Sequence, residues 1–405
     1  MNRIYKVIWS KVKNCYIVVS EIAKSHSKPV STKLNAGKTV AAVLAVAALC
    51  AGMTTSVMAA DQYYSVDDFG GRLASMGNKD NSGAKGIGSL AAGVGASVQS
   101  DGLYKGATAT VVGALNTVAI DTSSNTSAYD GVANSIVGVA NATQNANATL
   151  IFGAGNAVTN SYADVDLNLG NLDLSSPVAL SRQLGAAVGT SGGQVLVIGG
   201  ANSVDYARFS AVTGVSNTLN GADGNTSDYN FITGAKNTLT NTDSTYVIGS
   251  KNTVSDGSSN VVIGDNRKLT STTGNVVIGS ADDEMETTVS DATILGHNAN
   301  ATVADGVALG SKSVASVAKG VVGTVPTGTT VSDTDKATAT WTSTLGAISV
   351  GDTSKNLTRQ ITGVAAGTQA TDAVNVAQLN AVNTKVDNNA IHFFSVRGLS
   401  SQDNY

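Results

Sequence analysis

The stretch NVVIGDNRKLTSTTGNVVIGS, residues 260–280, contains the phrase NVVIG twice, with its glycines at positions 264 and 279. Valine and isoleucine favour extended backbone, and glycine tolerates the positive φ that a sharp corner requires. A phrase that returns after fifteen residues therefore predicts a short strand and a corner, repeated so that each strand lies in register on the one before it.

The phrase belongs to a longer ladder in which an aliphatic pair, or a near-pair, is followed by glycine. A second phrase, Gly-x-x-Asn-x-aliphatic, follows many of these glycines, as in GAKNTL at 234–239 and GSKNTV at 249–254. The series predicts an all-β solenoid, a β-roll of short strands and corners, whose coils are stable only as a stack. The expected repeat corners are Gly199, Gly214, Gly234, Gly249, Gly264, Gly279, Gly296 and Gly310.

Longer steps in the ladder predict insertions at corners. One is GADGNTSD at 221–228, and a larger one lies within residues 154–198. The larger insertion contains three aspartates, at 164, 166 and 173, but neither EF-hand spacing nor a Gly-Gly-x-Gly-x-Asp repeat. We therefore expect a solvated loop there and not a calcium site. Insertions on a rigid scaffold are where binding concentrates, so we expect any receptor contact to lie in them.

The N-terminus carries an export signal. Residues 38–59 begin with a lysine, continue through an apolar run and end in Val-Met-Ala, a small-residue cleavage pattern. The apolar core is too short to span a bilayer comfortably, which favours a cleaved signal over a membrane helix. We expect cleavage after Ala59 or Ala60.

An additional basic segment precedes this signal. Ile4, Ile8, Val12 and Tyr16 recur every four residues with lysines between them, which predicts an amphipathic helix suited to an anionic membrane face.

Charge and sulfur are unevenly distributed along the chain. The first 59 residues hold eight of the 25 Lys and Arg and one of the 29 acids, so the remainder carries 17 bases against 28 acids. This acidity argues against a nucleic-acid partner. Both cysteines, Cys15 and Cys50, lie in the segment removed on export, so the exported chain cannot form disulfides and must gain stability from repetition or oligomerisation.

Catalytic motifs are missing from the sequence. Only His297 and His392 remain after the signal, and neither lies in a cluster with nucleophile or metal-ligand spacing. We expect a nonenzymatic protein with no catalytic, cofactor-binding or metal-binding residue.

The C-terminal part changes character. Val376, Leu379, Asn383 and Val386 follow a three-four spacing that predicts a short coiled coil; Leu379, Val382 and Val386 give an equally acceptable seam.

Two segments resemble known modules. Met1-Asn2-Arg3 and residues 18–24, VVSEIAK, resemble the extended signal peptide region of large Gram-negative autotransporters, with Tyr16 where a tryptophan is usual. Residues 359–367, RQITGVAAG, and 371–379, TDAVNVAQL, resemble the neck of trimeric autotransporter adhesins, and the glycine ladder resembles their YadA-like head. The matching neck positions are Arg359, Ile361, Val364, Asp372, Val374, Asn375, Val376 and Leu379.

The resemblance implies a homotrimer with a left-handed parallel β-roll head, displayed on the cell surface or outer membrane of a Gram-negative-type bacterium. It further implies adhesion to host matrix, host cells or other bacteria. Membrane attachment would require a C-terminal anchor absent from this chain, so a fragment of a longer adhesin is expected. The alternative is a structural spacer of a surface fibre, with recognition located elsewhere.

The expected organisation is an extended signal region, a signal peptide, a glycine-rich start of the head, the β-roll head, a neck, a short stalk and the start of a further module. The corresponding residues are 1–24, 25–59, 60–108, 109–345, 346–382, 383–391 and 392–405.

Overall fold

The protein is described by a computed structural model covering residues 5–10, 15–20, 78, 82–101, 105–121, 130–162, 176–190 and 193–390. The chain divides into two units, Met1–Cys50 and Ala51–Tyr405.

The first unit contains two antiparallel strands, β1 (Tyr5–Ser10) and β2 (Cys15–Ser20), with Trp9 opposite Tyr16. The amphipathic helix expected from the four-residue spacing of Ile4, Ile8, Val12 and Tyr16 is therefore wrong. Both segments, YKVIWS and CYIVVS, are rich in β-branched and aromatic residues, which favour strands over helices.

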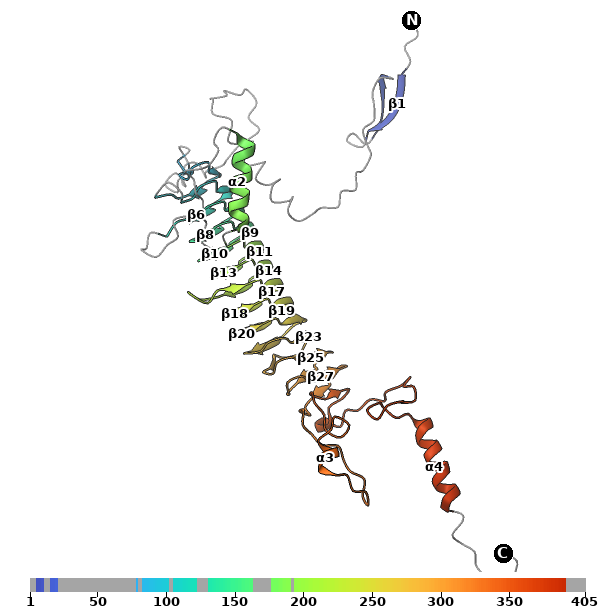
Figure 1. The fold of residues 1–405 in the computed structure, drawn as a ribbon. Helices are drawn as coiled ribbons and strands as arrows, with labels where there is room; N and C mark the ends of the chain where they lie inside the picture. Colours follow the sequence, from blue (N-terminus) through green and yellow to red (C-terminus); the bar gives the residue numbers. More distant parts are fainter. Residues whose placement is uncertain are drawn as a thin grey trace, which may run out of the picture. The chain divides into compact units, whose positions relative to one another are not determined.

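The second unit contains two long parallel sheets (Figure 1). Sheet 1 has thirteen strands: β3 (Leu90–Ala92), β5 (Thr110–Ala114), β7 (Ser135–Val139), β9 (Leu150–Ala154), β11 (Leu196–Gly200), β14 (Ala211–Val215), β17 (Phe231–Ala235), β19 (Tyr246–Ser250), β21 (Val261–Ile263), β23 (Val276–Ile278), β25 (Thr293–Leu295), β27 (Val307–Leu309) and β29 (Ile348–Ser349). Sheet 2 has ten: β4 (Ser97–Val98), β6 (Thr117–Ala119), β8 (Ala142–Gln144), β10 (Ala157–Thr159), β12 (Ser203–Asp205), β15 (Thr218–Asn220), β18 (Thr238–Asp243), β20 (Thr253–Ser258), β22 (Arg267–Thr270) and β24 (Met285–Thr287).

From β3 to β24 the chain alternates between these sheets, so each of these coils contributes one strand to each. The two NVVIG phrases pair in the predicted register, with Val262 opposite Val277. Gly199 likewise lies opposite Gly214, although the preceding step from Gly153 to Gly199 spans 46 residues. The expected parallel β-roll is confirmed.

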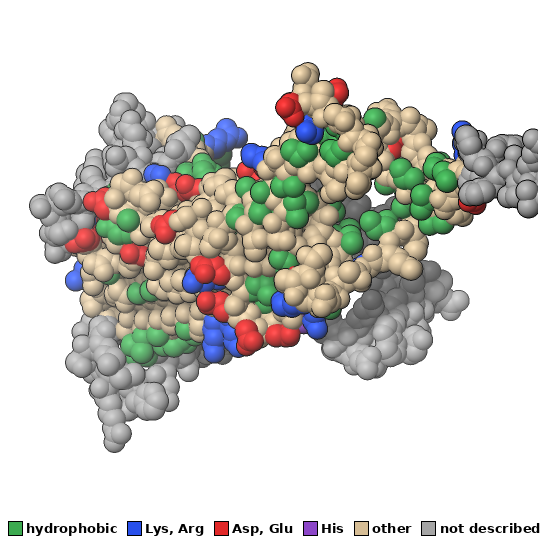
Figure 2. Space-filling view, turned by 90° about the horizontal axis from the view of Figure 1, so that it is seen from below, with side chains coloured by type: hydrophobic (Ala, Val, Ile, Leu, Met, Phe, Trp, Pro, Cys, Tyr) green, Lys and Arg blue, Asp and Glu red, His purple; other side chains and the backbone are tan. Residues whose placement is uncertain are grey.

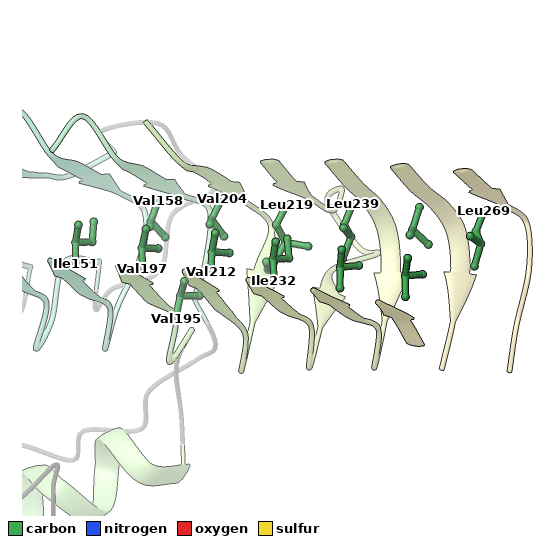
Figure 3. Close-up of a cluster of buried hydrophobic side chains, with 14 of the residues drawn as sticks. Ile151, Val158, Val195, Val197, Val204, Val212, Leu219, Ile232, Leu239 and Leu269 are labelled. Carbon is green, nitrogen blue, oxygen red and sulfur yellow. The ribbon is translucent and has the colours of Figure 1, made fainter. Parts of the chain in front are cut away.

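The core is a narrow aliphatic column between the two sheets. Figure 3 shows side chains of sheet 1, such as Val197, Val212 and Ile232, pointing toward those of sheet 2, such as Val204 and Leu219. All five side chains are buried because alternate residues of each short strand face inward. Two or three aliphatic residues per coil thus suffice for the core.

Several coils have a third side that the sequence did not predict. β13 (Ala207–Arg208) pairs with β16 (Ser227–Asp228) in parallel on this side. The longer strands β18 and β20 turn onto the same side, where Thr242 lies opposite Gly257. These third-side stretches are short and mostly polar, so period-two alternation cannot reveal them. In the last coils, β26 (Asn300–Ala301) and β28 (Val314–Ala315) form a parallel pair that follows sheet 2, since Asn300 Nδ2 donates to the Glu286 carbonyl of β24.

The larger insertion contains a helix, α2 (Pro177–Thr190), where the sequence predicted a loop. The segment ALSRQL is composed mainly of good helix formers, and proline is favoured in the first turn. The aspartates at 164, 166 and 173 lie outside the described residues.

The roll ends in a short excursion followed by the segment predicted as the neck. The excursion contains α3 (Asp333–Lys336), and β29 then returns to pair with β27, so sheet 1 extends to Ser349. A 3-10 turn, η4 (Thr353–Lys355), and helix α4 (Val376–Ala390) follow. Among the described helices, none has the length and apolar character needed to cross a bilayer.

Candidate interaction surfaces

The eight predicted corner glycines stack directly on one another at the end of sheet 1. All eight have positive φ, between 101° and 150°. A Cβ on Gly199 would lie 1.9 Å from the carbonyl oxygen of Gly214, and one on Gly249 would lie 1.8 Å from that of Gly264. Glycine is thus required both by its φ and by the close approach of the next coil.

A buried ladder of asparagines follows these glycines. In each step the asparagine Oδ1 accepts hydrogen bonds from the backbone N–H and the Nδ2 of the next asparagine, as Asn202 does from Asn217 at 3.0 Å each. The Nδ2 of Asn217 also donates to the carbonyl of Gly234 at 2.8 Å. The main ladder comprises Asn116, Asn141, Asn156, Asn202, Asn217, Asn237 and Asn252.

Replacing Asn217 by alanine should lower the free energy of unfolding by about 3 kcal/mol, because buried amide and carbonyl groups in the coils on both sides lose their partners. Denaturant unfolding of the mature chain measures this. The matched control is Asn220→Ala, three residues along in the partly exposed outer position of β15, which should change stability by less than about 0.5 kcal/mol. If Asn217→Ala and Asn220→Ala lowered the free energy of unfolding equally, the asparagine ladder would not be a stabilising element.

A second ladder lies at the opposite end of sheet 1 and includes the asparagine of NVVIG itself. Asn260 Oδ1 accepts from the backbone N–H of Asn275 at 3.1 Å, and Asn260 Nδ2 donates to the carbonyl of Thr272 at 2.8 Å. No structural role for this asparagine was predicted from the sequence. Its recurrence directly before an aliphatic strand was the available signal.

Arg267 replaces asparagine in the main ladder and is fully buried. Its backbone N–H donates to Asn252 Oδ1 at 3.0 Å, as a ladder asparagine would. Its guanidinium continues across the next two coils: Nε donates to the carbonyl of Gly279 at 2.7 Å, and Nη1 to that of Ala299 at 2.7 Å. Burial lowers the pKa of the guanidinium. No role for Arg267 was predicted from the sequence, although this residue breaks the Gly-x-x-Asn pattern.

Arg359 of the neck contacts the last coil. Its Nη1 donates to Ser313 Oγ at 3.0 Å, and its Nη2 donates to the Ser311 carbonyl at 2.5 Å. Nη1 also donates to the carbonyl of Val350. The guanidinium packs against Gly310: a Cβ added to this glycine would lie 3.1 Å from Arg359 Cζ. Arg359 thus joins the segment predicted as the neck to the last coil, in addition to the pairing of β29 with β27.

The rest of the neck organises the start of α4. Asn375 and Gln378 form a reciprocal capping box, in which Gln378 N donates to Asn375 Oδ1 at 3.1 Å and Asn375 N to Gln378 Oε1 at 3.2 Å. Asn375 Nδ2 also donates to the Val364 carbonyl at 3.2 Å. Backbone N–H groups of Gln369 and Thr368 lower the pKa of Asp372.

The remaining predicted neck residues are apolar and exposed in the single chain: Ile361, Val374, Val376 and Leu379. Val382 and Val386 on α4 are exposed as well. Both coiled-coil seams expected from the sequence are therefore compatible with the exposed residues of α4.

The two sheets present different outer faces. Sheet 1 has two outward columns, one on each side of its buried central column. The first outward column is Leu90, Thr110, Ser135, Leu150, Leu196, Ala211, Phe231, Tyr246, Val261, Val276, Thr293, Val307 and Ile348. The second is Ala92, Val112, Val137, Phe152, Ile198, Thr213, Thr233, Ile248, Ile263, Ile278, Leu295 and Leu309.

Neither column contains a charged residue, and none of its residues is buried in the single chain. Sheet 2 differs, because its outward positions include Asp205, Lys268 and Glu286 among many threonines and serines. Figure 2 shows acidic and basic side chains interspersed in one band of the surface beside apolar patches. A continuous uncharged face of this kind is typical of a contact surface.

The smaller insertion is held firmly at its base. Arg208 Nη2 donates to Asp228 Oδ2 at 2.7 Å and to Thr226 Oγ1 at 2.8 Å. At the tip, Ala222 and Asn225 exchange backbone hydrogen bonds, which closes a tight turn around Asp223 and Gly224. The exposed tip is thus a closed turn on an ion-paired base.

Asp130 is a buried carboxylate near the first coils. Its oxygens accept from the backbone N–H groups of Asp121 at 2.6 Å and Ala146 at 3.2 Å. Burial outweighs these hydrogen bonds and raises the pKa of Asp130 to about 6, from 3.8. Because the folded state holds this proton more tightly, protonation at low pH stabilises the fold.

This pKa predicts a pH dependence. The stabilisation should be complete below pH 3.8 and lost as the pH rises through 6, a total of about 3 kcal/mol. Denaturant unfolding between pH 3.5 and 7.5 of the wild type and of Asp130→Asn measures it. The stability of the variant relative to the wild type should increase by that amount over the window. A difference independent of pH would contradict the raised pKa.

The two histidines and the predicted cleavage residues are the remaining positions singled out from the sequence. His297 is exposed and lies 3.1 Å from Asp282 Oδ1, while His392, Ala59 and Ala60 lie outside the described residues. Within the described part of the chain, no group of three or more His, Cys, Asp or Glu side chains is arranged to hold a metal ion.

Two family models match the ends of the chain. Residues 1–50 match the extended signal peptide of the type V secretion system, and residues 360–397 match the coiled stalk of trimeric autotransporter adhesins.

Two curated proteins are similar over short stretches. The autotransporter adhesin BadA of Bartonella henselae is 69% identical over 42 residues, which is 10% of this chain and 1% of that protein. The trimeric autotransporter adhesin AtaA of Acinetobacter sp. (strain Tol 5) is 57% identical over 56 residues, 14% of this chain and 2% of that protein. The chain thus spans a very small part of these relatives.

Two solved structures share local similarity. The C-terminal YadA-like domain of a Burkholderia pseudomallei protein is 30% identical over 28% of this chain and 50% of that chain, with a TM-score of 0.22. The collagen-binding domain of the Yersinia adhesin YadA is 20% identical over 44% of this chain and 86% of that chain, with a TM-score of 0.26. At these TM-scores, neither similarity bears on the fold or the function of this chain.

Proposed function

We propose, from the premise that this chain belongs to the trimeric autotransporter adhesins, that three copies of it pack side by side as a nonenzymatic adhesive head. The observation that supports this most directly is the uncharged outer face of sheet 1. Its two outward columns run over thirteen and twelve strands, and the residues between them from β5 to β27 belong to the buried core of the roll. An apolar face of this length is unfavourable in water and is stabilised by burial against an equivalent face.

A threefold arrangement covers this face in all copies at once. Three parallel rolls around an axis along the stack direct sheet 1 inward and leave sheet 2 and the third side outward. Each copy then contributes the same coil at the same height. The exposed apolar residues of α4 continue the same arrangement, because a short helix with one apolar seam needs partners to be stable.

The outward surface is the adhesive surface. Sheet 2 presents a regular array of threonine and serine side chains, and the Asp223 turn projects beside it on the rigid Arg208–Asp228 base. Three copies repeat each weak contact, which raises the overall affinity for a target with repeated epitopes. The targets we propose are host matrix, host cell surfaces or other bacterial cells, reached after export through the N-terminal signal.

Two measurements test this function. Light scattering of the mature chain, residues 60–405, should give three times the chain mass; a folded monomer would exclude the assembly. The same protein, immobilised, should capture collagen, fibronectin or bacterial cells above a coiled-coil control.

Substitution at the insertion separates adhesion from a spacer role. Asp223→Lys should reduce capture severalfold, whereas Asp283→Lys, an equally exposed charge reversal in another loop, should not. A trimer that captures none of these targets would favour the spacer, with recognition located elsewhere in the fibre.

A further inference from the structure

The aliphatic part of the sheet 1 face cannot by itself align three copies along the stack. The coils at Val261/Ile263 and Val276/Ile278 present identical side chains outward, one above the other. If one copy slides along its neighbour by one coil, about 4.8 Å, these contacts are recreated without loss. Identical repeats specify a contact but not a height.

Aromatic residues interrupt the aliphatic face at two heights: Phe152 in the second outward column, and Phe231 with Tyr246 in the first. Phe231 and Tyr246 occupy the first outward column in consecutive coils, and their rings are stacked at 5.1 Å with an interplanar angle of 5°. They remain 44% and 46% exposed in the single chain. The preceding coil has small side chains in both columns, Ala211 in the first and Thr213 in the second. The face therefore changes abruptly from its smallest coil to its bulkiest pair.

Threefold packing determines what these rings meet. In a closed ring of copies the interface is heterologous, so the first outward column of one copy faces the second outward column of the next at the same height. At the height of Phe231 that position is Thr233, and at the height of Tyr246 it is Ile248. A large ring opposite a small threonine is the size complementarity of a packed core.

We infer that Phe231 and Tyr246 of each copy pack against the second outward column of the next copy and thereby fix the height at which the three chains align. The occupant of this surface is a second copy of the chain. A slip of one coil would remove one ring from the aromatic layer and force it into the adjacent layer, which creates a cavity in one and overpacks the other. The inference rests on the proposed trimer.

Cysteine reporters measure both the facing of the columns and the height. The exported chain has no cysteine of its own, since Cys15 and Cys50 precede the cleavage site. Chains with Val276→Cys and chains with Ile278→Cys, differently tagged, are co-expressed as residues 60–405 and oxidised. A second mixture replaces Ile278→Cys by Ile263→Cys, the equivalent position one coil earlier.

The aligned pair should give at least about tenfold more tag-to-tag disulfide than the offset pair. One coil of displacement, about 4.8 Å, added to a lateral Cα separation of about 5.5 Å gives about 7.3 Å, beyond the reach of a disulfide. In a Phe231→Thr/Tyr246→Thr background this selectivity should fall to about threefold or less. The matched control is Phe209→Thr/Tyr229→Thr, which removes another stacked pair with 5.1 Å between centroids but lies outside the two columns; selectivity should persist there.

The outcomes separate this inference from the proposed function. Trimers that keep tenfold selectivity without Phe231 and Tyr246 would overturn the inference and leave the trimer intact. Trimers in which the aligned pair forms no disulfide would overturn the facing of the columns. A chain that is monomeric by mass would instead refute the proposed assembly. If the double threonine variant does not assemble, Phe231→Thr/Thr233→Phe keeps a ring at the same height and should restore assembly and selectivity; failure to do so would also overturn the inference.

Discussion

Gly199→Ala is expected to lower the free energy of unfolding by about 4 kcal/mol or more. Two costs combine. The φ of 130° strains any residue with a Cβ, at about 1–3 kcal/mol. In addition, the new Cβ would lie 1.9 Å from the Gly214 carbonyl oxygen, so the next coil must move away. Its inter-strand hydrogen bonds would then break.

The adjacent glycine provides the control. Gly200 lies in the same strand without a positive φ, and a Cβ there would be 3.5 Å from the nearest atom, the Ala154 carbonyl oxygen. Gly200→Ala should therefore change stability by less than about 1 kcal/mol. Thermal and denaturant unfolding of both variants measure the difference. Similar stabilities would show that the glycine stack can open without cost and would contradict the tight approach of the coils.

Arg267→Met should cost about 4 kcal/mol. Methionine fills much of the space but donates no hydrogen bond, so the carbonyl groups of Gly279, Gly296 and Ala299 lose their partner in a buried site. Arg267→Asn should cost about half as much. Its amide can reach the carbonyl of Gly279, as every other ladder asparagine reaches the next glycine, but it cannot span to the second coil.

Lys268→Met is the control for the arginine substitution. Lys268 is the next residue, and its Nζ lies 3.2 Å from Glu286 and 3.8 Å from Glu284 at the surface. Exposed pairs of this kind contribute less than about 1 kcal/mol. In denaturant unfolding, Arg267→Met should therefore be the least stable of the three variants, Arg267→Asn intermediate and Lys268→Met the most stable. An Arg267→Met protein as stable as the wild type would show that the guanidinium is dispensable.

The repeat could be predicted from the sequence because it depends on local chemistry. Valine, isoleucine and glycine at fixed spacing specify strand, corner and register, and Val262 opposite Val277 follows directly. The asparagine ladders could not be predicted in the same way. Gly-x-x-Asn was visible, but its role depends on the distance between coils, which a single unit does not contain.

Two other features show the limits of spacing. In the first unit, a four-residue spacing of apolar residues fits either a helix or two short strands. The β-branched residues favour the strands. Arg267 is charged, so composition alone assigns it to the surface. Its buried partners, the carbonyl groups of Gly279 and Ala299, lie in the next two coils. That information is spread over coils far apart in the sequence.

The direction of the inter-coil hydrogen bonds has a mechanical consequence. These bonds run along the stack, so a pull along the stack loads all bonds between two coils at once and detaches the terminal coil first. Each lost coil of fifteen residues frees about 50 Å of chain in place of about 4.8 Å of height. Single-molecule stretching of a head should therefore show repeated extensions of about 45 Å, and a single large extension would contradict this. A tethered cell would then yield to flow by lengthening its attachment one coil at a time, while the remaining coils stay folded.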